Sequence, residues 1–212
     1  MGRVDGLAVC LSAVSVSERG NRNPVVLLHG IGDTSRVLDR LTRYLKERGW
    51  MTHGLDLIPN TGKAGLDELA VQVDTYIEST FAPEQKIDLV GFSMGGVVAR
   101  YYLQRLSGLN RTSRLITISS PHRGTLTAFL GWNRGARQLR PGSAFLADLA
   151  QDSHVLSQID FTSIWTPWDL MILPPHSSLI PHGSPVRLRV PTHWHMLRNP
   201  QVFRAVEAAL LR

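Results

Sequence analysis

The chain has 212 residues, which is enough for a single α/β domain with a sizeable hydrophobic core, and we expect one domain over residues 1–212. Its hydrophobic content of 43% is ordinary for a globular protein, and no apolar run approaches the roughly 20 residues that span a bilayer. The single cysteine, Cys10, excludes an internal disulfide framework and a cysteine-based metal site. It also favours a reducing compartment, so we expect a cytoplasmic protein.

The formal net charge is +6, and most of the 23 basic residues are arginines. A basic surface favours anionic partners, namely lipid head groups or nucleic acid, although an excess of arginine also arises from codon usage alone. No helix-turn-helix, zinc or single-strand-binding pattern supports nucleic acid. We therefore expect no nucleic-acid partner, and peripheral contact with an anionic membrane surface stays open.

The N-terminal segment at residues 7–16 is short and apolar, with Arg3 ahead of it. A signal peptide needs a net positive start and an uninterrupted apolar stretch. Here Asp5 offsets the charge and serines interrupt the apolar residues. The segment therefore predicts an edge strand.

Short apolar runs alternate with helical spacing along the rest of the chain, and this alternation predicts parallel strands joined by helices. We expect strands at residues 25–28, 52–57, 87–90, 114–118, 161–165 and 186–190. We expect helices at residues 37–45, 66–77, 94–102 and 202–210, with a short one around 145–149. The predicted fold is a doubly wound, mostly parallel sheet of about six strands with helices on both faces. Ligands of such sheets bind beyond the carboxyl ends of the strands.

A Gly-x-Ser-x-Gly motif centred on Ser93 joins the strand at 87–90 to the helix that follows it. A serine on so tight a turn has a strained backbone, and Gly91 and Gly95 are needed because a side chain would collide with the neighbouring strand or helix. The turn exposes the hydroxyl at the positive end of a helix, where a nucleophile can be activated. The motif also arises by chance as a glycine-rich turn, and its strand and helix argue against that interpretation.

A second glycine-rich bend, at residues 29–33, follows the strand at 25–28. Such a bend can turn a backbone N–H toward the position of a reacting carbonyl oxygen. We predict that the N–H groups of Ile31 and Met94 are the oxyanion donors, and that His29 contacts the substrate. The alternative is an ordinary strand-to-helix loop with a buried histidine.

A serine hydroxyl is a weak nucleophile without a base, and the base needs a carboxylate that fixes its tautomer. The chain order expected on this fold is serine, then acid, then histidine, each on a loop after a strand. Asp169 follows the strand at 161–165, and His193 follows the strand at 186–190. His195 is the alternative base, because residues two apart on an extended chain point the same way.

Residues 124–159 lose the regular spacing, and we expect them to form an excursion that covers the substrate. Its candidate substrate contacts are Phe129, Leu130 and Trp132, which are followed by Arg134, Arg137 and Arg140. Aromatic residues beside arginines are typical of a membrane or micelle interface. They are equally consistent with a connector packed on the sheet.

Several stretches of the chain resemble those of the α/β-hydrolase superfamily, and within it those of the small bacterial lipases and esterases of the class 2 type. The similar stretches recur in the family's order at residues 29–32, 91–96, 120–125, 163–169 and 193–197. The resemblance implies a triad of Ser93, Asp169 and His193 with Ile31 and Met94 as oxyanion donors. It also implies hydrolysis of carboxylic esters through an acyl-enzyme, with no cofactor and no metal. The short chain leaves little room for a mobile lid.

The leading hypothesis is a serine hydrolase that cleaves carboxylic esters, either acyl lipids or simple esters. A thioesterase or an acyltransferase would use the same residues. A catalytically silent lipid-binding protein would share the fold, but the intact set of serine, aspartate and histidine argues against it. We expect an acyl ester substrate and favour a monomer.

Overall fold

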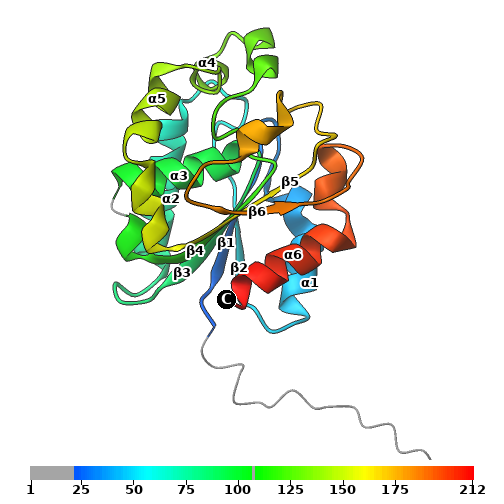
Figure 1. Ribbon diagram of the computed structural model, residues 1–212. Coiled ribbons are helices and arrows are strands. Elements are labelled where there is room, and N and C mark those ends of the chain that lie inside the picture. The colour runs from blue at the N-terminus through cyan, green and yellow to red at the C-terminus, as the bar shows by residue number, and fades with distance from the viewer. Residues whose placement is uncertain (1–21, 107) are drawn as a thin grey trace, which may run out of the picture.

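The computed structural model describes residues 22–106 and 108–212, which form a sheet covered by helices (Figure 1). The strands are β1 (Val25–Leu28), β2 (Thr52–Leu55), β3 (Ile87–Phe92), β4 (Thr112–Ile118), β5 (Asp160–Trp165) and β6 (Ser184–Arg187). Their order is β2-β1-β3-β4-β5-β6, and every neighbouring pair is parallel. The predicted parallel sheet is therefore confirmed, while the edge strand predicted at residues 7–16 lies outside the described part of the chain.

Helices cover both faces of the sheet, as the burial of alternate strand residues on opposite faces requires. The α-helices are α1 (Asp39–Lys46), α2 (Leu66–Thr80), α3 (Met94–Arg105), α4 (Arg134–Gln138), α5 (Ala144–Gln151) and α6 (Pro200–Leu210). Figure 1 shows α1 and α6 on one side of the sheet, where they form a core with Val25 and Leu27 of β1. On the other side α2, α3 and α5 form a second core with Val26 and Leu28.

Short 3-10 helices connect these elements. They are η2 (Ser35–Leu38), η3 (Gly108–Asn110), η4 (Leu126–Leu130), η5 (Ser153–Gln158), η6 (Pro175–Ser178) and η7 (Trp194–Leu197). Within the described residues, no helix is both long enough and apolar enough to cross a membrane.

The parallel arrangement brings the loops after β1, β3, β4, β5 and β6 to one edge of the sheet. Leu28 of β1 is in register with Gly91 of β3, and Gly91 is in register with Thr117 of β4. The loops that follow these three central strands therefore begin at about the same height. All predicted site residues come from loops at this edge.

Two strands, β2 and β6, end before their predicted apolar runs do. The run at 52–57 leaves the sheet after Leu55, because the N–H of Leu57 donates to the His29 ring and that of Ile58 donates to Gln72. The last strand covers Ser184–Arg187 instead of 186–190. Beyond it the carbonyl oxygen of Val190 accepts a hydrogen bond from the Thr166 side chain. At Leu57 and Val190 the hydrogen-bond partners are side chains and not a neighbouring strand.

The excursion at residues 124–159 is helical and contains η4, α4, α5 and η5. Its later half is fixed to α3 by Arg100, which is 1% exposed and donates to the carbonyl oxygens of His122 and Leu149. Its earlier half, around η4, exposes several large apolar side chains. The backbone of this earlier half is nevertheless held by hydrogen bonds from Leu126 to the carbonyl oxygen of Leu173 and from Gly135 to that of Gly62.

Candidate active site

Ser93 lies on the turn between β3 and α3 with φ of 51° and ψ of −121°, a backbone conformation that costs an L-residue about 1–3 kcal/mol. Its N–H donates to the carbonyl oxygen of Ile118 at 2.9 Å, which fixes the turn to β4. A Cβ on Gly91 would lie 2.4 Å from the backbone of Gly96, and one on Gly95 would lie 2.5 Å from the carbonyl oxygen of Leu28. The glycines are thus required by close backbone approach, as the motif predicted.

Asp169 and His193 come together from the loops after β5 and β6. The Nδ1 of His193 lies 2.8 Å from Oδ2 of Asp169, and both residues are buried. The other carboxylate oxygen, Oδ1, accepts the N–H groups of Met171 at 2.9 Å and Ile172 at 3.0 Å. The bond from Thr166 to the carbonyl oxygen of Val190 holds the two loops together just before the pair.

The hydrogen bonds to Asp169 outweigh its burial. Burial alone raises the pKa of this carboxyl, but the hydrogen bond and charge of His193 and the backbone N–H of Ile172 bring the pKa below its ordinary value. Asp169 is therefore ionised at neutral pH and accepts the Nδ1–H of His193. This tautomer leaves Nε2 of His193 as the ring's lone-pair nitrogen, as a general base requires.

The His193 ring lies beside the residue that precedes Ser93. Its centroid is 4.7 Å from the ring of Phe92, and 5.6 Å from the ring of Trp194 at an interplanar angle of 87°. Among the described residues, no hydrogen bond joins the Ser93 hydroxyl to His193, and Asp169 is the ring's partner. Such catalytic contacts are often long before substrate binds and tighten in the complex.

His195 has different contacts from His193. It is exposed, and its Nδ1 lies 2.8 Å from the Thr192 hydroxyl. Within the described residues its only polar side-chain partner is this hydroxyl, so no carboxylate fixes its tautomer. The structure thus pairs His193 with the acid and leaves His195 at the surface.

The bend at residues 29–33 is held by its own hydrogen bonds. The N–H of Gly32 donates to the carbonyl oxygen of Asn60 at 2.7 Å, and the N–H of Asp33 donates to that of Gly30. Among the described residues the N–H of Ile31 has no acceptor, which leaves it free for a substrate oxygen.

His29 is fully buried under this bend. Its Nε2 accepts the N–H of Leu57 at 2.9 Å, so Nδ1 carries the proton and donates to the carbonyl oxygen of Gly30 at 2.8 Å. Both ring nitrogens are therefore occupied within the protein. In this structure His29 fixes the loop after β2 to the bend and has no free nitrogen for a substrate.

Two features of the site are absent from the sequence prediction. Asp33 turns inward, and its Oδ2 is buried without a hydrogen-bond partner among the described residues, close to Gly30 and Phe92. Burial raises the pKa of this carboxyl. The other feature is the exposed apolar side chains Trp168, Leu170 and Met171 beside Asp169. Their position directly before and after Asp169 in the sequence was the available signal.

These side chains lie next to the predicted substrate contacts. Thr125 donates from its hydroxyl to the carbonyl oxygen of Met171 at 2.8 Å, and the N–H of Leu126 donates to that of Leu173 at 2.8 Å. Leu130 is 84% exposed and Trp132 is 83% exposed. We call the combined surface the apolar patch; its residues are Leu126, Phe129, Leu130, Trp132, Trp168, Leu170 and Met171.

Solved structures with the same architecture include the mature form of Bacillus licheniformis lipase BlEst2, with a TM-score of 0.72 and 14% identity over 89% of this chain and 92% of that chain. Aspergillus fumigatus lipase B has a TM-score of 0.77 and 18% identity over 90% of this chain and 53% of that one. At such identities the likeness concerns the fold alone. With the family match described next, that fold, a parallel sheet with the serine turn after β3, makes the chain a member of the α/β-hydrolase superfamily.

The sequence also identifies a family within that superfamily. Residues 24–168 match the family model of palmitoyl protein thioesterase, and the chain belongs to this family of hydrolases. The matched range includes Ser93 and ends immediately before Asp169.

Curated relatives agree with the family. The lysosomal thioesterase PPT2 of Mus musculus is 32% identical over 135 residues, which are 59% of this chain and 43% of the relative. The Homo sapiens protein of the same name gives the same identity and coverage. The chain thus spans less than half the length of the curated relatives it matches. Our expectation of a cytoplasmic location stays a prediction, as does the likeness to small bacterial lipases of the class 2 type.

Proposed function

We propose that this chain hydrolyses acyl thioesters and carboxylic esters through an acyl-enzyme on Ser93. The Ser93 oxygen attacks the acyl carbonyl carbon while Nε2 of His193 takes the hydroxyl proton, and His193 then gives this proton to the leaving sulfur or oxygen. Asp169 orients the ring and stabilises its charged form. The N–H groups of Ile31 and Met94 receive the negative charge on the carbonyl oxygen. Water repeats the attack with the same base and releases the acid.

The observation that carries this proposal is the buried 2.8 Å hydrogen bond between Asp169 and His193, beside the strained turn of Ser93. If the histidine and the aspartate faced solvent, the carboxylate would fix neither the tautomer nor the orientation of the ring. Here burial and two backbone N–H donors fix the carboxylate, and the carboxylate fixes the ring.

The decisive experiment is covalent labelling with a fluorophosphonate probe, which requires an activated serine. The wild-type protein should be labelled, and Ser93→Ala should not be. Ser157→Ala removes an exposed serine from η5 and should be labelled like wild type. Hydrolysis should fall on the order of 10⁶-fold in Ser93→Ala, because the nucleophile is lost while the binding groups remain. Wild-type labelling of a folded Ser93→Ala protein would overturn the assignment.

Thioester cleavage is the finer part of the proposal, supported by the family and by the names of the curated relatives. It is checked by comparing kcat/KM for an aryl thioester and an aryl ester with the same acyl chain. A higher value for the thioester supports a thioesterase, and a higher value for the oxygen ester supports an esterase or lipase. A protein that binds the acyl chain but is neither labelled nor active would be the silent lipid-binding alternative.

We also propose that the apolar patch contacts a lipid surface while the acyl chain enters the site. Seven large apolar side chains exposed on two adjoining segments are typical of an interaction surface. The arginines contribute less than the sequence suggested, because Arg134 is paired with Asp67 at 2.6 Å and with Glu68. Arg140 lies over the Phe129 ring at 5.0 Å and donates to the carbonyl oxygen of Gly131.

A further inference from the structure

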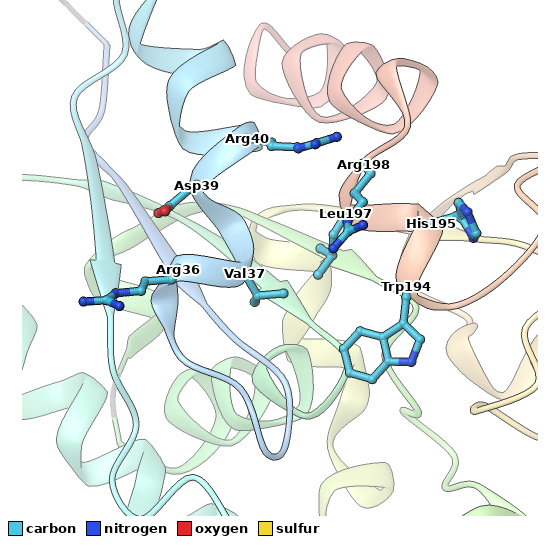
Figure 2. A pocket seen from close by; sticks show the side chains of 8 residues that line it. All are labelled: Arg36, Val37, Asp39, Arg40, Trp194, His195, Leu197 and Arg198. Atoms are coloured by element: carbon cyan, nitrogen blue, oxygen red, sulfur yellow. The ribbon is translucent and has the colours of Figure 1, made fainter.

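A pocket of about 380 Å³ lies beside the candidate base, between the start of α1 and η7 (Figure 2). Its walls come from two segments, residues 36–40 and residues 194–198. Val37, Leu197 and Trp194 provide apolar surface, and Trp194 is 47% exposed. Trp194, the residue after His193, thus forms one wall of an open, partly apolar pocket.

The charged residues of this pocket are mainly basic. Arg36, Arg40 and Arg198 line it with a single carboxylate, that of Asp39. In Figure 2 the side chains of Arg40 and Arg198 extend between the two segments, whereas Arg36 and Asp39 point away from Trp194. Among the described residues, neither Arg40 nor Arg198 has a carboxylate within ion-pair distance. Their positive charges are thus available to a ligand.

Guanidinium groups without a carboxylate partner favour phosphate, because their planar arrangement of N–H donors matches its oxygens. The indole face of Trp194 and the side chain of Val37 would contact the apolar part of such a ligand. His195 also lines the pocket. His195 is thus part of the wall of this pocket and not the catalytic base.

The position of the pocket relates it to one half of the substrate. The Trp194 ring is 5.6 Å from the His193 ring, centroid to centroid, and 6.0 Å from that of Phe92. In the proposed reaction His193 gives its proton to the leaving group, so the leaving group must lie on the His193 side of Ser93. The pocket, which includes the neighbour of His193, therefore lies on the side of the leaving group.

We propose that this pocket is a subsite for a phosphate group on the leaving portion of the substrate, bound by Arg40 and Arg198. This inference rests on the proposed acyl hydrolysis and names the chemistry of its substrate. Two sources carry such a phosphate: a phosphorylated thiol carrier such as coenzyme A, and the head group of a phospholipid. The experiment separates them with substrate pairs that differ only by the phosphate-bearing part.

The first pair is an acyl-coenzyme A and the same acyl group on pantetheine; the second is a lysophosphatidylglycerol and the corresponding monoacylglycerol. For each pair the ratio of kcat/KM with and without phosphate is measured in wild type, Arg40→Gln, Arg198→Gln and the double variant. Arg43→Gln is the matched control, because it removes the same charge from an exposed position on α1 that does not line the pocket.

We expect the ratio to fall about tenfold in each single variant, since a hydrogen-bonded charge is lost, and further in the double variant. It should not change in Arg43→Gln. A fall confined to the first pair assigns the site to a thiol carrier, and a fall confined to the second assigns it to a phospholipid head group. Equal ratios in all five proteins for both pairs would overturn the subsite.

A separate measurement distinguishes a failed subsite from a failed function. If the wild-type protein hydrolyses none of these substrates, the proposed function fails and the subsite is judged by calorimetric titration with adenosine 3′,5′-bisphosphate and with glycerol 3-phosphate. Binding of either probe at least tenfold weaker in the double variant than in Arg43→Gln supports the subsite. Equal binding, or no binding to wild type, rejects it.

Discussion

His193 and His195 are two residues apart, but only His193 contacts a carboxylate. The turn that starts η7 makes them diverge, with His193 buried and His195 exposed. An extended chain would have pointed both in the same direction. At this position the sequence left two candidates for the base, and the local backbone conformation separates them.

We predict that His193→Ala lowers hydrolysis of a soluble short-chain ester nearly as far as Ser93→Ala, because residues of a triad act as a unit. His195→Ala should retain a substantial fraction of the activity. Both variants are assayed on the same phosphate-free ester, with circular dichroism as the check of folding. The reverse ranking would assign the base to His195.

Asp33 gives a prediction about pH. Burial raises its pKa in the folded protein, so ionisation of Asp33 costs stability as the pH rises above its unfolded pKa of about 4. Below that pH the carboxyl is protonated in both states and contributes nothing. Asp33→Asn should therefore raise the melting temperature at pH 7 and leave it nearly unchanged at pH 3. A variant that gains equally at both pH values would show that Asp33 acts through packing and not through its charge.

At the scale of secondary-structure elements, alternating apolar runs predicted the six described strands and their parallel pairing. The exact ends were less predictable, because they depend on side chains far away in the sequence. Leu57 is apolar like a strand residue, but its N–H pairs with His29, which is 28 positions away. The helical nature of the excursion was also missed in part, because its short helices carry too few turns to show a period.

The apolar patch belongs to this scale, and its test uses its two most exposed members. We predict that Leu130→Ser with Trp132→Ser weakens flotation with lipid vesicles, because the two most exposed side chains of the apolar patch are lost. Met51→Ser is the matched control, an exposed apolar residue just before β2, at the opposite edge of the sheet. Hydrolysis of a soluble short ester should persist in the control and in the double variant.

The same vesicles measure the electrostatic contribution. Because Arg134 is neutralised by Asp67 and Glu68, we expect binding to persist when salt shortens the screening length to about 3 Å, near 1 M. Loss of wild-type binding at that salt concentration would show that charge, and not apolar contact, dominates.

At the scale of the whole molecule, one side chain joins three parts of the fold. Arg100 on α3 donates to the carbonyl oxygen of His122 after β4 and to that of Leu149 on α5, and burial lowers its pKa to about 10. Its replacement leaves the buried carbonyl oxygen of His122 without a donor, while that of Leu149 keeps Gln104 as its donor. The excursion, the helix layer and the site edge are therefore coupled in stability.

We predict that Arg100→Leu lowers the free energy of unfolding by about 1–3 kcal/mol, the cost of one unsatisfied buried carbonyl oxygen. Arg43→Leu, the same substitution at an exposed position on α1, should change it by less than about 0.5 kcal/mol. Chemical denaturation of the two proteins measures both values. A similar, small loss in both would mean that solvent replaces Arg100 at no cost.

The candidate site could be predicted where the fold sets the order of the functional residues along the chain. Ser93, Asp169 and His193 each follow a strand in the expected sequence, so topology alone placed them at one edge. The inward carboxylate of Asp33 and the pocket beside Trp194 depend on how separate loops pack, and no spacing in the sequence records that. His29 is a predicted substrate contact whose two ring nitrogens are used within the protein, and the roles of the other site residues stay predictions.

The positive φ of Ser93 has a consequence for anyone who selects this protein for heat resistance. Glycine adopts that conformation without the side-chain penalty of about 1–3 kcal/mol, and loses roughly 1 kcal/mol through its freer unfolded chain. Ser93→Gly should therefore melt at a higher temperature than wild type and have no nucleophile. A selection that rewards only thermal survival would enrich this inactive variant, so every round must include a turnover assay.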